Sequence, residues 1–123
     1  MNYDMYPSDI EESYLVEKIG EILTVDCLFP DPTFFAAKDK IAWGVERSKT
    51  QVPKGLDMIN RNCQDSMKKN GWACTNKLSL GDIYVIHWLS TVIFNPFFGK
   101  ENSKHLEKYP VIQEYWKKTK PLI

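Results

Sequence analysis

Apolar residues recur along this chain with the spacing of α-helices. The clearest pattern lies between residues 52 and 67, where apolar positions are separated by three or four residues and polar side chains fill most positions between them. Side chains at this spacing share one face of a helix. The pattern predicts an amphipathic helix that ends at Gly71, because glycine commonly follows the last helical turn. The apolar positions are Val52, Leu56, Ile59, Cys63 and Met67.

A second amphipathic helix is predicted near the N-terminus, where Ser8 and Glu11 are spaced to form a capping box at its start. Pro30-Asp31-Pro32 later interrupts the helical pattern, since each proline lacks a backbone N–H and disfavours helix at the residue before it. We therefore expect two helical segments around these prolines. The residues that recur at helical spacing before them are Leu15, Ile19, Ile22 and Asp26.

The most apolar run of the chain extends from Ile83 to Phe94. Ser79 and Asp82 are spaced as a capping box, in which the Ser79 side chain accepts the N–H of Asp82 and the Asp82 carboxylate accepts the N–H of Ser79. Leu78 is placed to pack on Ile83 as a hydrophobic staple. Because apolar residues cover nearly the whole circumference, we expect this helix at the centre of a bundle.

Prolines and glycines divide the remaining C-terminal part. Pro96 with Gly99 predicts a turn, and a short helical turn is expected through Lys104 and Leu106. Pro110 suits the first turn of a last helix. We find no alternating strand pattern of useful length, internal repeat or low-complexity tract. The sequence therefore predicts an all-α bundle of about five to six helices in one domain.

Several of these segments resemble one known family. The turn Asn70-Gly71-Trp72, followed by the segment 77–83, resembles the turn and capped core helix in the C-terminal domain of cytosolic glutathione S-transferases, with the sigma, alpha and pi classes closest. Residues 52–56 resemble the start of the preceding long helix of that domain, and residues 109–116 resemble its closing helix. The resemblance implies a linker-like segment at residues 1–7, a helical domain at residues 8–123, and no thioredoxin-like half in this chain.

Charge and cysteine usage narrow the functional classes. Lysine plus arginine equals aspartate plus glutamate, at 16 each, which argues against electrostatic binding of nucleic acid or an anionic membrane. The longest apolar run is too short to span a bilayer. Three cysteines without a CxxC pair indicate reduced thiols and an intracellular, cytoplasmic protein. His87 and His105 stand apart from each other and from the cysteines, so we expect no metal site.

The sequence contains no phosphate-binding glycine loop, nucleophile elbow or dinucleotide fingerprint. In the family that the chain resembles, the residue that activates the thiol and most groups that bind glutathione lie in the thioredoxin-like half. Conjugation needs a thiolate stabilised by a preorganised polar site. We therefore expect no catalytic residue and no bound cofactor in this chain alone, and we expect the chain alone to be inactive. Where a thioredoxin-like half is present, the resemblance implies glutathione as the co-substrate.

The resemblance points to three candidate residues on the substrate side. Phe35 falls near a position often occupied by an aromatic of the electrophile pocket, and Phe34 is its neighbour. Both also suit the core or an interface beneath a kinked helix. Asp26 follows Val25, which aligns with a carboxylate that in several relatives reaches across the dimer to the amino group of glutathione. An ordinary solvated or capping aspartate is the alternative.

Two functions follow from the resemblance. The first is the helical half of a glutathione transferase, which supplies a wall for a hydrophobic small-molecule electrophile and contacts for a homodimer. The second is a stand-alone, non-catalytic interaction module within a larger protein assembly. In both cases we expect an exposed apolar strip where a thioredoxin-like half or a partner packs.

Overall fold

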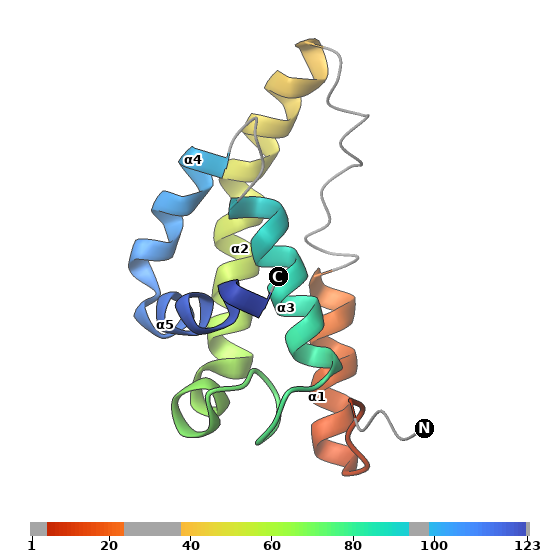
Figure 1. Ribbon diagram of the computed structural model, residues 1–123. Coiled ribbons are helices and arrows are strands. Elements are labelled where there is room, and N and C mark those ends of the chain that lie inside the picture. Colours follow the sequence, from red (N-terminus) through yellow and green to blue (C-terminus); the bar gives the residue numbers. More distant parts are fainter. Residues whose placement is uncertain (1–4, 24–37, 94–98, 123) are drawn as a thin grey trace.

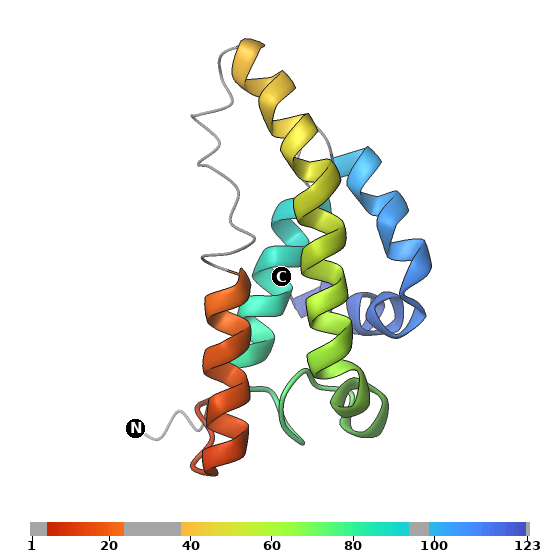
Figure 2. The same cartoon turned by 180° about the vertical axis from the view of Figure 1, so that it is seen from behind.

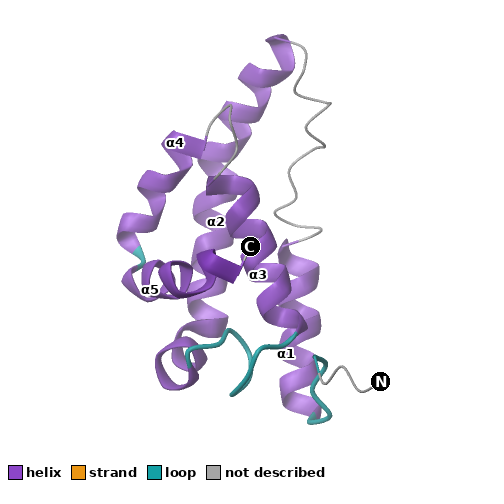
Figure 3. Cartoon of the chain, in the orientation of Figure 1, coloured by secondary structure: helices purple, strands orange, loops and turns teal. Residues whose placement is uncertain are grey.

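The computed structural model describes residues 5–23, 38–93 and 99–122 of the chain (Figure 1). Within these ranges every regular element is a helix and none is a strand (Figure 3). The all-α class is confirmed. The described helices are α1 (Ile10–Glu21), α2 (Lys38–Asn70), α3 (Leu80–Ile93), α4 (Gly99–Ser103), α5 (Pro110–Thr119) and the 3₁₀ helices η3 (Lys104–Lys108) and η4 (Lys120–Leu122). Four of the described α-helices have ten or more residues, whereas α4 has only five. The number of longer helices is therefore slightly lower than the five to six predicted.

The long helix α2 runs through the whole molecule, and the other helices pack along it. Helices α1 and α3 lie side by side and run in the same direction (Figures 1 and 2). Helix α5 packs against α2 towards the C-terminal end of that helix. Because α1 and α3 begin at the same end of the bundle, the loop before α3 lies close to the segment that leads into α1.

Helix α1 begins one residue later than predicted. Asp9, and not Ser8, is the N-cap, and its carboxylate accepts the N–H of Glu12 at 3.0 Å. Aspartate caps helices as well as serine does. The shift places Glu11 and Glu12 in the first turn, where negative side chains are favoured by the helix dipole.

Helix α2 extends much further towards the N-terminus than the prediction that it starts near Val52. It begins at Lys38 and contains Pro53 within its length. An interior proline removes one backbone hydrogen bond and costs about 3 kcal/mol. Val52 and Leu56, on either side of the proline, are both fully buried, so the apolar face continues across it. The proline therefore lies within the helix, next to residues that belong to the core.

The apolar face of α2 forms the main part of the core. All five residues of the predicted face are buried, with exposed fractions between 0% and 6%. Gly71 ends the helix as predicted, with φ at 78° and its N–H bonded to the carbonyl of Met67 at 3.0 Å. Glycine is needed at such a φ because a side chain is rarely accommodated there.

Helix α3 packs on its neighbours through aromatic rings that lie against glycines. The Tyr84 ring covers Gly20 of α1, and the Trp88 ring covers Gly55 of α2. The helix contacts several neighbours but is not buried on every side, because Ile83, His87 and Thr91 are exposed along one stripe. These residues are four positions apart and therefore share one face.

The last helix begins at Pro110, which occupies its first turn, in agreement with the prediction. The turn expected through Lys104 and Leu106 is present as η3. Pro96, which was expected to form a turn with Gly99, lies outside the described residues.

Candidate functional site

The three candidate residues on the substrate side, Asp26, Phe34 and Phe35, lie outside the described residues. Their roles stay predictions. The structure instead describes the capping residues at the start of α3, the loop before them, and two surface cavities.

Asp82 is the centre of a buried polar cluster. Its side chain is 0% exposed, and its Oδ2 accepts the N–H of Ser79 at 3.0 Å. Its Oδ1 accepts the N–H of Ala73 at 2.8 Å and the hydroxyl of Tyr115 at 2.7 Å. A buried carboxylate needs such donors, since an unpaired charge in the core is costly. One side chain therefore joins α3 to the preceding loop and to α5.

The Ser79 side chain does not make the hydrogen bond that the predicted capping box assigned to it. Its hydroxyl donates to Asp82 Oδ2 at 3.5 Å, and the N–H of Asp82 is bonded to the backbone carbonyl of Ser79 at 3.0 Å. The carboxylate half of the box is thus present, whereas the hydroxyl half is replaced by a backbone bond. The packing of Leu78 on Ile83 as a hydrophobic staple stays a prediction. Leu78 is half-buried, and Ile83 is 43% exposed.

A donor in the first turn of α3 is bonded from outside the helix. The N–H of Leu80 donates to the carbonyl of Met5 at 2.6 Å. Helix starts leave such N–H groups without partners in the helix itself. The segment before α1, part of which was expected to be linker-like, therefore helps to hold the start of α3.

The loop from Gly71 to Ser79 is fastened to α2 by Ser66. The Ser66 hydroxyl lies 2.8 Å from the carbonyl oxygen of Trp72 and 3.5 Å from that of Thr75. Within the loop, the Thr75 hydroxyl donates to the carbonyl of Lys77 at 2.8 Å and accepts its N–H at 3.2 Å. These contacts give a loop without regular secondary structure a defined path across the helix.

Two titratable groups in this region are held in their protonated forms. Burial raises the pKa of Tyr115 well above its usual range, and the charge and hydrogen bond of Asp82 raise it further. The pKa of Cys63 is raised by its hydrogen bond to Cys74, then by burial and by the nearby charge of Asp82. Tyr115 therefore stays a hydrogen-bond donor, and Cys63 is no nucleophile while the cluster stays closed.

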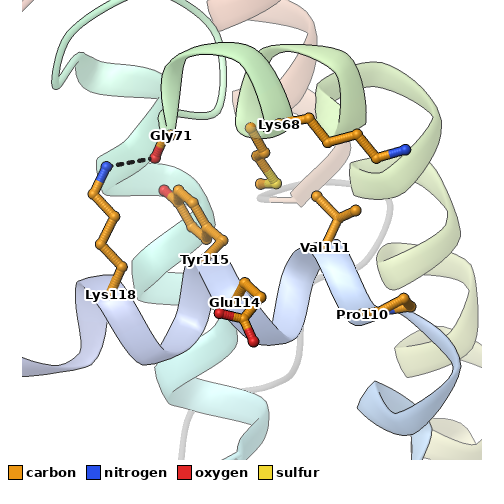
Figure 4. A pocket seen from close by; sticks show the side chains of 8 residues that line it. Lys68, Gly71, Pro110, Val111, Glu114, Tyr115 and Lys118 are labelled. Atoms are coloured by element: carbon orange, nitrogen blue, oxygen red, sulfur yellow. Dashed lines mark hydrogen bonds between the residues drawn. The ribbon is translucent and has the colours of Figure 1, made fainter.

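A cavity of about 500 Å³ lies between the end of α2 and helix α5 (Figure 4). Met67, Val111 and Tyr115 form part of its wall. Lys118 crosses one end, where its ammonium donates to the carbonyl of Gly71 at 2.8 Å and lies 3.6 Å from the centre of the Trp72 ring. A cation over an indole face is a favourable contact. Lys118 thus ties α5 to the loop.

A second cavity of about 220 Å³ is polar and lies where the segment before α1 meets the loop before α3. Asp9 and Glu12 line one side, and Thr75, Asn76 and Ser79 line the other.

The described residues contain no group of three or more histidine, cysteine or acidic side chains placed to hold a metal ion. Nor does any helix of the described ranges have the length and apolarity to cross a membrane.

Large apolar side chains are exposed at one end of the bundle. Ile10 is 83% exposed and Tyr14 is 67% exposed, both in the first half of α1, while Ile83 lies in the first turn of α3. Tyr6, just before α1, is 48% exposed and donates to Glu17 at 2.6 Å. These side chains all lie near the starts of α1 and α3.

Sequence reasoning missed two pairings in the cluster. Residues 109–116 were identified only as a closing helix, and the cysteines only as reduced thiols, with Cys63 on the apolar face of its helix. The signal for the first pairing was present in part, because a buried tyrosine needs a hydrogen-bond partner and Asp82 was already expected at the start of a buried helix. No spacing in the sequence indicates the second pairing.

The fold and the capped helix agree with the comparison against protein families. The model of the glutathione S-transferase C-terminal domain matches residues 21–119, and the chain belongs to this family. No curated protein and no solved structure was found to match the chain.

Proposed function

We propose that this chain is the helical half of a glutathione S-transferase-like protein, in which it supplies the electrophile-side wall and the oligomer contacts. The family match over residues 21–119 carries this proposal. Catalysis requires the thioredoxin-like half, since glutathione binding and thiol activation belong to that half in the family.

The exposed apolar side chains near the starts of α1 and α3 support a role in contacts. Ile10 and Tyr14 are one helical turn apart and present apolar surface to solvent. Large apolar residues grouped near one end of a protein commonly mark an interaction site. We assign this end of the bundle to contacts with a thioredoxin-like half or with a second copy in a homodimer.

The wall for the electrophile is assigned to Phe34 and Phe35, with Asp26 as a candidate contact to the amino group of glutathione. An aromatic side chain offers a hydrophobic small molecule a large apolar surface. The resemblance to the family supports these residues, and glutathione is the co-substrate that the proposal implies.

The test uses the native gene product, tagged at its C-terminus and purified gently. An intact mass that includes a thioredoxin-like half, retention on immobilised glutathione and conjugation of an aromatic halide are expected. Phe35→Ala should then raise KM for the halide several-fold without changing retention on glutathione, with Asp65→Ala, at an exposed position of α2, as the control. A folded two-domain product that does not bind glutathione contradicts the proposal.

The second candidate is a non-catalytic interaction module in a larger assembly. The same exposed residues, Ile10 and Tyr14, favour it, because an assembly partner would cover them equally well. A native product of this length that elutes with stable large partners and does not bind glutathione is the outcome expected of this candidate. Ile10→Asp should release those partners.

A further inference from the structure

Cys63 and Cys74 come from different elements and meet in the core. Cys63 lies on the buried face of α2 and is 0% exposed, and Cys74 lies in the following loop and is 6% exposed. Ser66, three residues after Cys63 on the same helix, accounts for their approach. Its hydroxyl lies close to the carbonyls of Trp72 and Thr75, at 2.8 Å and 3.5 Å. The segment that contains Cys74 therefore crosses α2 beside Cys63.

The surroundings hold the two thiols against each other. The Cys74 sulfur occupies the space beside Gly81 that a side-chain Cβ would need. Ala73, the residue before Cys74, is bonded to Asp82 at 2.8 Å, which fixes the backbone at this point. Both side chains belong to the same buried cluster, and the interaction with Cys74 is the largest cause that raises the pKa of the Cys63 thiol. Both sulfurs are free in the structure.

We propose that Cys63 and Cys74 form an oxidisable pair, which a disulfide such as oxidised glutathione converts into an internal disulfide that fastens the loop to α2. The inference is independent of the proposed transferase function. Cys74 attacks one sulfur of the oxidant and releases one glutathione, which takes the proton that Cys74 gives up. Cys63 then attacks the sulfur of Cys74 in this mixed disulfide, and the second glutathione leaves with the proton from Cys63. Two thiols are oxidised and one disulfide is reduced.

The reaction requires the loop to open. In the closed structure the Cys63 thiol is protonated and inaccessible, and a thiol attacks only as its thiolate. Cys74 lies on a loop held by a few side-chain bonds, so it reaches the oxidant before a residue of the long helix does. When the loop closes again, it brings the mixed disulfide at Cys74 back within reach of the Cys63 thiol.

The disulfide would close a ring from Cys63 to Cys74. Such a ring limits the freedom of the unfolded chain and thereby stabilises the folded state. Because Ser66 and Asp82 already fix the loop in the same position, the link is compatible with the folded arrangement. We expect the melting midpoint to rise by roughly 5–10 °C on oxidation and to return on reduction.

The test uses the full chain with Cys27→Ser, so that only this pair can react. After incubation with oxidised glutathione, the intact mass should fall by two hydrogen atoms. Trypsin cleaves after Arg61, Lys68, Lys69 and Lys77, and so places the two cysteines on separate peptides, 62–68 and 70–77. Without reduction these two peptides should be recovered as one linked species.

Cys63→Ala and Cys74→Ala, each with Cys27→Ser, are the matched controls and should show no rise in melting midpoint. A stable mixed disulfide with glutathione, in place of the linked peptides, would overturn the proposal. So would two free thiols after a time in which iodoacetamide alkylates both, because the loop would then open without the pair reacting. Thiols that react with neither reagent would also overturn it, since the loop would not open.

Discussion

The Tyr115 hydroxyl donates a 2.7 Å hydrogen bond to Asp82 Oδ1, and both side chains are buried. The bond connects α5 to the start of α3 across 33 positions of sequence. The same oxygen accepts the N–H of Ala73 at 2.8 Å, so the loop meets both helices at one atom. One carboxylate therefore joins α3, α5 and the loop before α3.

Asp82→Ala should destabilise the domain by about 3–5 kcal/mol. The change leaves the N–H groups of Ser79 and Ala73 and the hydroxyl of Tyr115 without their acceptor in a buried site. Urea unfolding followed by circular dichroism measures the loss. Asp65→Ala, at an exposed position of α2, is the control and should change stability by less than about 0.5 kcal/mol. Equal effects of the two substitutions would show that the Asp82 cluster contributes little.

Ser79→Ala should cost only about 0.5–1 kcal/mol. The Ser79 hydroxyl makes one long bond of 3.5 Å to Asp82, whereas its backbone N–H and carbonyl make the shorter bonds and survive the substitution. The same unfolding measurement applies. A loss as large as that of Asp82→Ala would mean that the hydroxyl, and not the backbone, caps the helix.

Alkaline pH should destabilise the domain through Tyr115. Its pKa is raised from the ordinary value of 10.0, so above that pH the unfolded chain loses a proton that the folded chain keeps. Unfolding then releases a proton, and the free energy of unfolding falls by about 1.4 kcal/mol per pH unit. The contribution of Tyr115 to the free energy of unfolding is therefore fully present below pH 10 and is lost progressively as the pH rises above 10. Cys63 adds a similar decline from its ordinary pKa of 9.0 upward.

Urea unfolding between about pH 8 and pH 11 measures this decline, with Tyr115→Phe as the control. The variant should be about 1–2 kcal/mol less stable at neutral pH, because it loses the bond to Asp82. Above pH 10 its stability should fall less steeply than that of the unmodified chain. Parallel curves would contradict the assignment of the alkaline transition to Tyr115.

Periodicity predicted the parts of the fold that depend on local sequence. The five apolar positions from Val52 to Met67 were identified as one face, and all are buried. Gly71 and Pro110 were placed at a helix end and a helix start because each residue has a backbone preference that suits only such a position.

The errors arose where tertiary packing overrides a local signal. Residues 52–56 resembled a helix start, yet α2 extends through Pro53 back to Lys38, and the residues directly before and near it in the core, Val52 and Leu56, are both buried. The apolar run in α3 indicated a helix at the centre of the bundle, yet its residue Ile83 is 43% exposed. In the same way, the contacts of Asp82 with Tyr115 and of Cys63 with Cys74 depend on how the helices meet, which no local spacing encodes.

Gly55→Ala should destabilise the domain by about 1–3 kcal/mol, although alanine favours helix over glycine by about 1 kcal/mol. The new methyl group would enter the space occupied by the Trp88 ring, and Gly55 and Trp88 are both buried. A double-mutant cycle with Trp88→Leu separates the two effects. Trp88→Leu alone leaves a void, whereas in its presence Gly55→Ala should become neutral or stabilising, because the methyl group fills part of that void. If the cost of Gly55→Ala is the same with tryptophan and with leucine at position 88, the close approach of α3 to α2 is not what requires glycine.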